Sequence, residues 1–339
     1  MPDAIQPGSR IAMFDDPEAF GAHVHHAVAR VLPLSAGGYR ARVTLVQLPS
    51  IGLAMGEESL PRLYESETSP DRIYFRLRQT ADPTSRLNGV EHQPGRIRIR
   101  RPGQTVVDVS PGPAVIRSMS LPIADLAARA DRTFGRPPPV LLDDCVLIRP
   151  APGRFARLAA LQRDVFRLAA ERPAALAHRP TAAALDAQLG EALLAILFES
   201  APERDTAAAC RGHAIMARVL DRIGAEPNHA FTLAELCGAG GCSAKTLEVL
   251  FRARMGTTPN RFLRLRRLWA VRRALLAADP RMATVSQLAM DGGFWELGRF
   301  AAVYRAQFGE SPSQTLQRRV DSARPEHVSP SLRRPAALS

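Results

Sequence analysis

The C-terminal third of the chain repeats one arrangement of hydrophobic and glycine positions. Between residues 232 and 316, two segments each place a short apolar run before a group of glycines and a longer apolar stripe after it. Five positions recur at one constant offset: Leu247 with Phe300, Phe251 with Tyr304, Met255 with Phe308, Gly256 with Gly309 and Pro259 with Pro312. A repeat this regular indicates a duplicated supersecondary unit.

Each unit is predicted to fold as a helix, a glycine turn and a second helix. In the first unit, Gly238 to Gly241 are expected to break the short helix, because glycine adopts the left-handed backbone of a sharp turn. Ser243 is a suitable N-cap for the helix that follows. The buried stripe of that helix has 3-and-4 spacing and consists of Leu247, Leu250, Phe251 and Met255. In the second unit, Gly292 and Gly293 form the turn, and the stripe consists of Phe300, Tyr304 and Phe308.

The outer faces of the two second helices are polar, and a helix-turn-helix with such a face fits the major groove of DNA. Lys245 and Arg299 are the best candidates for base contacts, because long donors suit guanine O6 and N7; either could hold a phosphate instead. Glu248 and Glu296 could accept from cytosine N4 or pair with a nearby arginine. The full set of base-contact candidates is Lys245, Glu248, Trp295, Glu296 and Arg299, and the phosphate candidates are Ser243, Arg252, Arg267 and Arg305.

With these residues, the stretch from about 213 to 319 resembles the DNA-binding domain of the AraC/XylS family of bacterial transcription regulators. The most specific part is Gly293-Phe294-Trp295-Glu296-Leu297-Gly298-Arg299-Phe300, followed by Tyr304-Arg305, Phe308-Gly309 and Ser311-Pro312-Ser313. The resemblance implies that a long helix, here residues 260–278, holds the two reader helices one turn of DNA apart, ~34 Å. The chain departs from the family pattern at Cys237, where a small alanine is usual, at Trp295, which replaces a cap serine, and at Gly298, which replaces a phosphate-contacting serine.

The first part of the chain has a different periodicity. From Tyr39 to Ile116 apolar and polar residues alternate, with Pro/Gly turns between the runs, which predicts an antiparallel sandwich or small barrel. One face of two such strands is rich in arginine: Arg72, Arg76 and Arg78, then Arg96, Arg98 and Arg100. Rows of this kind are more often a solvated sheet face than a pocket for an acidic effector, so we expect the solvated face.

After Leu121 the spacing becomes helical. Two amphipathic segments, around residues 158–168 and 185–197, are separated by Arg172-Pro173 and Arg179-Pro180 and predict a helical hairpin. Its leucines either pack on their own sheet or, as the resemblance implies, carry a dimer contact. The predicted fold class is therefore α+β: a β-rich sensor with a helical hairpin (1–200), a linker (201–212), an all-α DNA-binding domain (213–320) and a disordered tail (321–339).

The charge distribution favours a polyanionic partner for the C-terminal third. The formal net charge is +12, and residues 213–320 contain 16 Lys+Arg and 8 Asp+Glu, a balance of +8, against 29 − 25 = +4 for the remainder. Lys245 is the only lysine, so most of this charge is arginine.

Several other classes of protein are disfavoured. His23, His25 and His26 resemble the paired histidines of cupin metal sites, but the expected glutamate is replaced by Val28, Ala29 and Arg30, so we expect no metal. No serine elbow and no phosphate loop occurs, so we expect neither an enzyme nor a cofactor. The start carries no signal peptide, no stretch reaches the ~18 apolar residues of a membrane span, and the four cysteines are expected to be thiols of a cytoplasmic protein.

The sequence thus predicts a cytoplasmic, sequence-specific DNA-binding transcription regulator controlled by an effector bound to its first domain. Its expected partners are double-stranded DNA, a small-molecule effector, RNA polymerase and a second copy of the chain in a homodimer, with no membrane. The alternative is a ligand-independent regulator whose first domain is a protein-interaction or dimerisation module.

Overall fold

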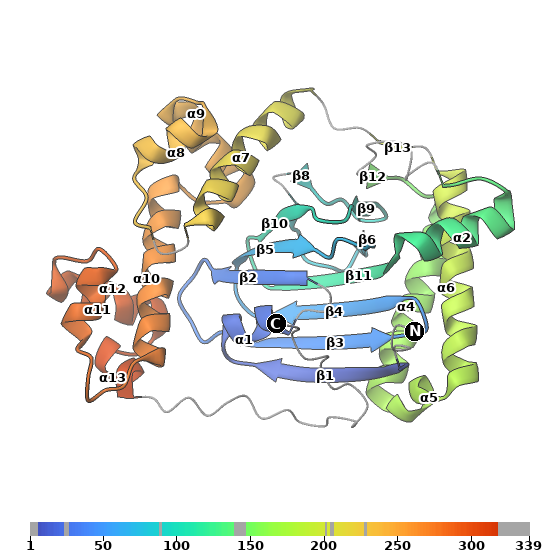
Figure 1. Ribbon diagram of the computed structural model, residues 1–339, viewed down its shortest axis with the longest axis horizontal. Helices are drawn as coiled ribbons and strands as arrows, with labels where there is room; N and C mark the ends of the chain where they lie inside the picture. The colour runs from blue at the N-terminus through green and yellow to red at the C-terminus, as the bar shows by residue number, and fades with distance from the viewer. Residues whose placement is uncertain are drawn as a thin grey trace.

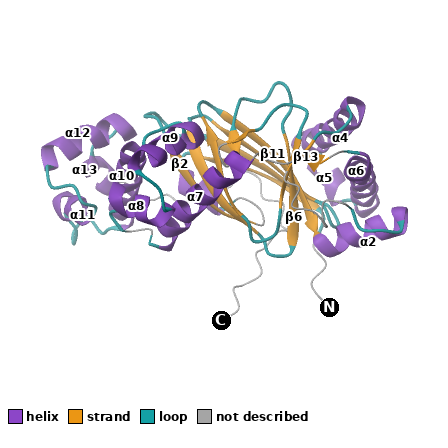
Figure 2. Ribbon diagram, turned by 90° about the horizontal axis from the view of Figure 1, so that it is seen from above, coloured by secondary structure: helices purple, strands orange, loops and turns teal. Residues whose placement is uncertain are grey.

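Two antiparallel sheets form the middle of the molecule, with helices on either side of them (Figures 1 and 2). The computed structural model describes residues 6–23, 27–87, 90–138, 147–200, 202–203, 207–226 and 229–317. The expected tail, residues 201 and 204–206 of the expected linker, and His25 and His26 lie outside the described residues.

The larger sheet has the strand order β1-β3-β4-β11-β6-β9-β12-β13 and the smaller one the order β2-β5-β10-β7-β8, with antiparallel neighbours throughout. The larger sheet contains β1 (Gly8–Phe14), β3 (Ala41–Gln47), β4 (Gly52–Glu58), β6 (Arg72–Leu77), β9 (Ile97–Arg100), β11 (Ala114–Pro122), β12 (Leu147–Ile148) and β13 (Pro202–Glu203). The smaller sheet contains β2 (Ala27–Pro33), β5 (Arg62–Thr68), β7 (Arg86–Leu87), β8 (Val90–Glu91) and β10 (Thr105–Ser110). The predicted sandwich is confirmed, although β1 and β2 precede the region in which the sequence indicated strands.

Helices flank the sandwich on two sides. On one side are α2 (Ile123–Phe134), α4 (Pro152–Glu171), α5 (Pro173–Ala177) and α6 (Arg179–Glu199), and short α1 (Pro17–Ala22) joins β1 to β2. On the other side are α7 (Ala207–Ala225), α8 (Leu233–Gly240), α9 (Ala244–Met255), α10 (Pro259–Ala277), α11 (Val285–Asp291), α12 (Leu297–Phe308) and α13 (Pro312–Gln317). This layout is the α+β class predicted from the sequence.

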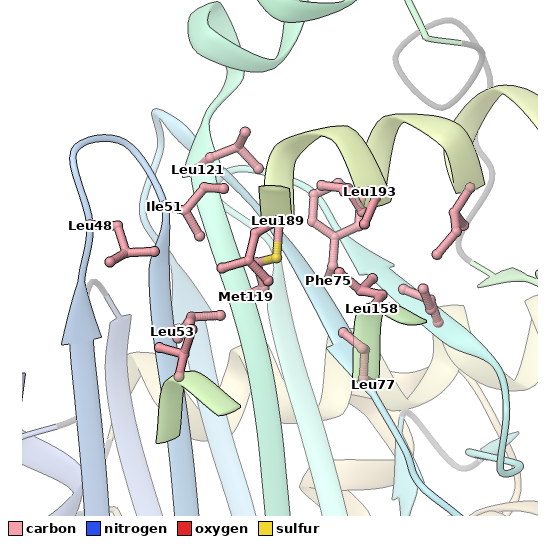
Figure 3. Packing of buried hydrophobic residues seen from close by; sticks show 14 of the residues in the cluster. Leu48, Ile51, Leu53, Phe75, Leu77, Met119, Leu121, Leu158, Leu189 and Leu193 are labelled. Carbon is pink, nitrogen blue, oxygen red and sulfur yellow. The ribbon is translucent and has the colours of Figure 1, made fainter. Parts of the chain in front are cut away.

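The predicted helical hairpin is confirmed as α4 and α6, which cover the outer face of the larger sheet. Leu158 of α4 and Leu189 and Leu193 of α6 pack into one buried cluster with Phe75 and Met119 of the strands (Figure 3). The hairpin leucines therefore pack on the sheet of their own chain, which was the first of the two interpretations of this segment.

Helix α6 is long and apolar enough to cross a membrane by length and composition, contrary to the expectation that no stretch would be. Half of that segment is buried inside the protein. Its Asp186 carboxylate accepts from the backbone N–H of Ser50 and of Ile51, at 2.9 and 3.0 Å, and pairs with Arg129. A core helix that is covered on one side by a sheet meets the same criteria of length and composition as a membrane span.

The expectation that the arginine rows form a solvated face is wrong. Arg72, Arg76, Arg78 and Arg98 are all buried. Arg72 donates to the carbonyls of Ser50 and Ser120 at 3.0 Å each, and Arg78 donates to the carbonyl of His92 at 2.7 Å. The alternation of apolar and polar residues predicts that a strand has two different faces. It does not show whether the polar face is exposed to solvent or, as here, covered by a second sheet.

Replacing Leu193 with alanine is expected to destabilise the first domain by about 2–5 kcal/mol, because it removes a buried side chain and leaves a cavity between α6 and the sheet. Chemical denaturation of the full chain measures this change. The matched control is Gln188→Ala on the exposed face of the same helix, for which we expect a change within about 0.5 kcal/mol. Equal effects of the two substitutions would contradict the packing described.

Candidate nucleic-acid interface

Both short first helices of the repeat begin at a threonine cap. The hydroxyl of Thr232 accepts from the backbone N–H of Glu235 at 3.3 Å, and the Glu235 carboxylate accepts from the Thr232 N–H at 2.7 Å, a reciprocal capping box at the start of α8. Thr284 caps α11 by accepting from the N–H of Gln287 at 3.2 Å. These caps were not predicted from the sequence, although the Thr-x-x-Glu spacing of the first one indicates a capping box.

The glycines of the two units have two distinct roles, which corrects the expectation that Gly238 to Gly241 form the turn. Helix α8 continues through Gly240 and ends at Gly241, whose φ of 60° is left-handed. In the second unit Gly293 has the left-handed φ of 77°. The glycine before each turn lies at a close contact between helices instead: a Cβ on Gly240 would lie 3.0 Å from the Val219 side chain, and a Cβ on Gly292 would overlap that of Val271 at 2.2 Å.

The stripes predicted to be buried hold each second helix in place. Leu247 and Phe251 of α9, and Phe300 and Tyr304 of α12, are buried. The Tyr304 hydroxyl donates to the hydroxyl of Thr315 at 2.8 Å, which ties α12 to α13. Phe308 is half-buried and packs edge-on against Trp269 of α10, with ring centroids 4.8 Å apart.

The candidate contact residues of α9 lie on its exposed face. Ser243 caps the helix by accepting from the N–H of Thr246 at 3.2 Å. Lys245 is exposed and lies two residues after this N-cap. Glu248 and Arg252 are exposed and form an i,i+4 ion pair at 2.9 Å, which is one of the two roles considered for Glu248. Exposed i,i+4 ion pairs contribute only about 0.3–0.5 kcal/mol to stability, so either side chain can leave the pair to contact DNA.

The second reader helix presents its candidates in the same manner but begins differently. Its N-cap is Glu296, and the structure gives that residue no side-chain cap hydrogen bond. Glu296 lies 3.6 Å from Arg299, and both are about three-quarters exposed. Trp295 is 77% exposed in the turn before the helix, and Arg305 is exposed one turn from its end.

Helix α10 joins the two units, and its arginines have separate roles. Arg272 forms an ion pair with Glu310 at 2.6 Å, so it holds α13 against α10 rather than facing solvent. The guanidinium of Arg267, a phosphate candidate, is half-buried over the ring of Phe294, 5.7 Å from its centroid. Arg264 is exposed, and with Arg261 and Arg267 it lines an open groove of about 560 Å³ that also includes Thr232. This basic groove between α8 and α10 was not predicted from the sequence, because its residues come from separate segments of the chain.

The smaller sheet of the first domain docks on α10 and leaves the reader faces exposed (Figure 1). Leu32, Leu63, Val107 and Val109 of that sheet belong to the same buried cluster as Phe262 and Trp269 of α10. Polar contacts surround this dock: Arg273 pairs with Glu18 at 2.9 Å, Arg261 donates to the Leu34 carbonyl at 3.1 Å, and Gln307 donates to the Ser35 carbonyl at 2.9 Å. The first domain thus contacts both units without covering Lys245 or Arg299.

Gly292→Ala is expected to destabilise the second unit by about 1–3 kcal/mol, because its methyl group would overlap Val271 where α11 crosses α10. Denaturation followed by Trp269 and Trp295 fluorescence measures the effect. The control is Gly298→Ala, at a position where no heavy atom lies within 4 Å of the added Cβ, and which should be neutral or stabilise the helix by up to about 1 kcal/mol. Tolerance of both alanines would contradict the close crossing.

Comparison with known proteins agrees with this arrangement. Residues 236–318 match a family described as a helix-turn-helix domain. The probable thc operon regulatory protein of Rhodococcus erythropolis is 37% identical over 103 residues, covering 30% of this chain and 31% of that protein. XylDLEGF operon transcriptional activator 1 of Pseudomonas putida is 36% identical over 109 residues, covering 32% and 33%. Activator 2 of the same operon is 35% identical over 105 residues, covering 31% of this chain and 67% of that protein.

The match spans about a third of the length of the first two relatives. Among solved structures, the AraC-like transcriptional activator CuxR is 17% identical, with a TM-score of 0.37, over 84% of this chain and 99% of that one. A probable AraC family transcriptional regulator from Rhodopseudomonas palustris is 32% identical, with a TM-score of 0.28, over 30% of this chain and 94% of that one. On the sequence relatives and the two helix-turn-helix units, the chain belongs to the AraC/XylS family of bacterial transcription regulators.

Proposed function

We propose that the protein is a transcription regulator that binds double-stranded DNA sequence-specifically through α9 and α12, and that an effector bound in its first domain controls this binding. The observation that carries the proposal is the pair of exposed polar reader faces at the two ends of one helix, α10. That helix has 19 residues and is therefore ~28 Å long at 1.5 Å per residue. This length suits two readers that enter successive major-groove segments on one side of a duplex.

In this proposal the residues divide by role. Lys245, Glu248, Trp295, Glu296 and Arg299 contact base edges, and Ser243, Arg252, Arg267 and Arg305 contact phosphates. Arg264 joins the phosphate group because it is exposed beside the basic groove. Arginine–phosphate contacts supply most of the affinity, so binding falls steeply with salt, whereas the reader faces supply the discrimination.

Control by an effector is supported by the position of the dock. Strands β5 and β10 pair antiparallel, with Tyr64 opposite Asp108 and Leu63 opposite Val109. Tyr64 and Asp108 face a cavity between the two sheets, while Leu63 and Val109 face the helical domain. A ligand in the cavity therefore acts on the other side of the same strands that hold α10. The hairpin α4/α6 lies on the far side of the sheets from α10, so the signal passes through the smaller sheet and not through the hairpin (Figures 1 and 2).

The remaining partners belong to the same proposal. The protein acts in the cytoplasm, forms a homodimer and contacts RNA polymerase at the promoter. The alternative is a ligand-independent regulator whose first domain only binds another protein. A cavity with charged walls between the sheets favours the effector-controlled form, because a purely structural sandwich gains stability by filling that space with apolar side chains.

The test is binding of the full chain to DNA upstream of its own gene and of neighbouring genes, against scrambled DNA, over a series of salt concentrations. One segment should be bound about 10³-fold or more tightly than scrambled DNA at physiological salt. Lys245→Ala and Arg299→Ala should each cost about 1–3 kcal/mol on that segment and relax discrimination at one base position.

The matched control is Arg154→Ala, an exposed arginine of α4 on the far side of the sheets, which should leave both affinity and discrimination unchanged. Equal, salt-sensitive binding to every sequence would reduce the interface to its charge and remove the proposal.

A further inference from the structure

A cavity of about 60 Å³ lies inside the sandwich, between the two sheets. Its apolar wall is formed by Phe20 of α1 and by side chains of strands from both sheets, among them Val43, Ala54, Leu87 and Val106. Its polar wall contains Arg76, Arg100, Asp108, Tyr64, Ser66 and Ser118. At about 10–15 Å³ for each water, the space suits a ligand of roughly four to six non-hydrogen atoms.

Most of the buried charge beside the cavity is already paired. One oxygen of Asp108, Oδ2, accepts from Arg62 and from Arg76 at 2.8 Å each. Arg62 also pairs with Glu58 at 2.8 Å, and Glu58 accepts from the Tyr39 hydroxyl at 2.9 Å. Burial alone would raise the pKa of Asp108, but the two guanidinium groups outweigh it and hold the pKa below its usual value, so the carboxylate is ionised.

Arg100 is the charge left over from this arrangement. Its Nη2 donates to the hydroxyl and the carbonyl of Ser66, at 2.9 and 3.2 Å, and its guanidinium lies 5.8 Å from the centre of the Tyr74 ring. Both partners are neutral, and no carboxylate among the described residues pairs with it. The group thus counts three arginines, Arg62, Arg76 and Arg100, against the two carboxylates Glu58 and Asp108, an excess of 3 − 2 = +1.

Two residues that line the cavity each carry a polar atom without a hydrogen-bond partner. These atoms are Nε of Arg100, a donor, and Oδ1 of Asp108, an acceptor, and both are buried. A buried charged group left in this way costs free energy, and a ligand that satisfies both atoms recovers it. Such a ligand needs an anionic oxygen for Arg100 and an O–H or N–H donor for Asp108.

We propose that this cavity is a binding site for a short hydroxy acid, a carboxylate of the size of glycolate or lactate, with the carboxylate on Arg100 and the hydroxyl on Asp108. The anion neutralises the surplus positive charge, which a zwitterionic amino acid of the same size does not. The short carbon chain faces the apolar wall at Phe20, Leu87 and Val106.

The inference rests on the proposed function, for which it names the effector class. Asp108 and Ser66 lie on β10 and β5, the strands whose other face carries the dock for α10. A ligand that binds both Arg100 and Asp108 holds the strands that carry these side chains in one relative position. The ligand therefore acts directly behind the surface on which the DNA-binding helices are held.

The experiment is equilibrium dialysis of radiolabelled glycolate against the full chain, together with thermal unfolding in glycolate, acetate, glycine or ethylene glycol at matched ionic strength. Glycolate should bind stoichiometrically and raise Tm by roughly 5 °C at about 100 times its Kd. Acetate lacks the donor, glycine carries no net charge and ethylene glycol carries no anion, so each should bind at least about tenfold more weakly. No glycolate binding, or equal binding of glycolate and any of these three probes, overturns the assignment.

Two variants locate the site. Arg100→Gln should abolish binding, whereas Arg40→Gln, at an exposed position outside the cavity, should leave it unchanged. Ala54→Leu fills the cavity without changing charge and should also abolish binding, which provides the test if Arg100→Gln fails to fold. Undiminished binding by a folded form of either cavity variant overturns the proposal.

Operator binding on the same preparations separates this inference from the proposed function. A chain that selects its operator but binds no glycolate loses only the ligand assignment. A chain that binds glycolate but selects no DNA sequence retains the site and loses the proposed function.

Discussion

The buried carboxylate of Asp108 is the group on which the interior of the first domain depends. It holds Arg62 and Arg76 together between two sheets, and removing charge from either side would leave an unpaired ion in a buried position. The same residue lies on β10, whose outer face supports the DNA-binding helices. Strand β10 therefore carries buried charges on its inner face and the apolar contact with α10 on its outer face. A change in the charge balance on the inner face shifts the strand that supports the helices.

The helical domain depends on a different constraint, the close approach of helix backbones. In both units a glycine in close contact with a neighbouring helix precedes a glycine with left-handed backbone, so the first residue lies at the helix crossing and the next turns the chain. These crossings fix α8 against α7 and α11 against α10, and through them the direction in which α9 and α12 face. The polar residues on those faces are then free to vary, because none of Lys245, Arg299 or Arg305 takes part in the buried packing.

Burial also explains which arginines remain available to a polyanion. Arginine dominates the basic charge along the whole chain, yet Arg272 is used by Glu310, Arg267 stacks on Phe294, and Arg62 and Arg76 are neutralised inside the sandwich. Those that are exposed on the helical domain include Arg252 of α9, Arg299 and Arg305 of α12, and Arg261 and Arg264 beside the groove of α10, and others lie elsewhere, such as Arg211 and Arg218 on α7. The net charge of the domain is thus a poor guide to its contacts, whereas exposure and pairing distinguish structural guanidinium groups from free ones.

The sequence by itself determined the duplicated helix-turn-helix, the buried stripes, the strand region and the helical hairpin, because each follows from a local periodicity and from the backbone freedom of glycine. It did not determine β1 and β2, whose short runs carry little periodic signal, nor the roles of Gly240 and Gly292, which depend on Val219 and Val271 from other helices. Only the tertiary structure decided that the arginine rows are buried. A strand that is covered on both faces can have the same alternation of apolar and polar residues as a strand with one face exposed to solvent. The cavity, its surplus charge at Arg100 and the dock on α10 were likewise invisible, because they arise where residues far apart in the chain meet.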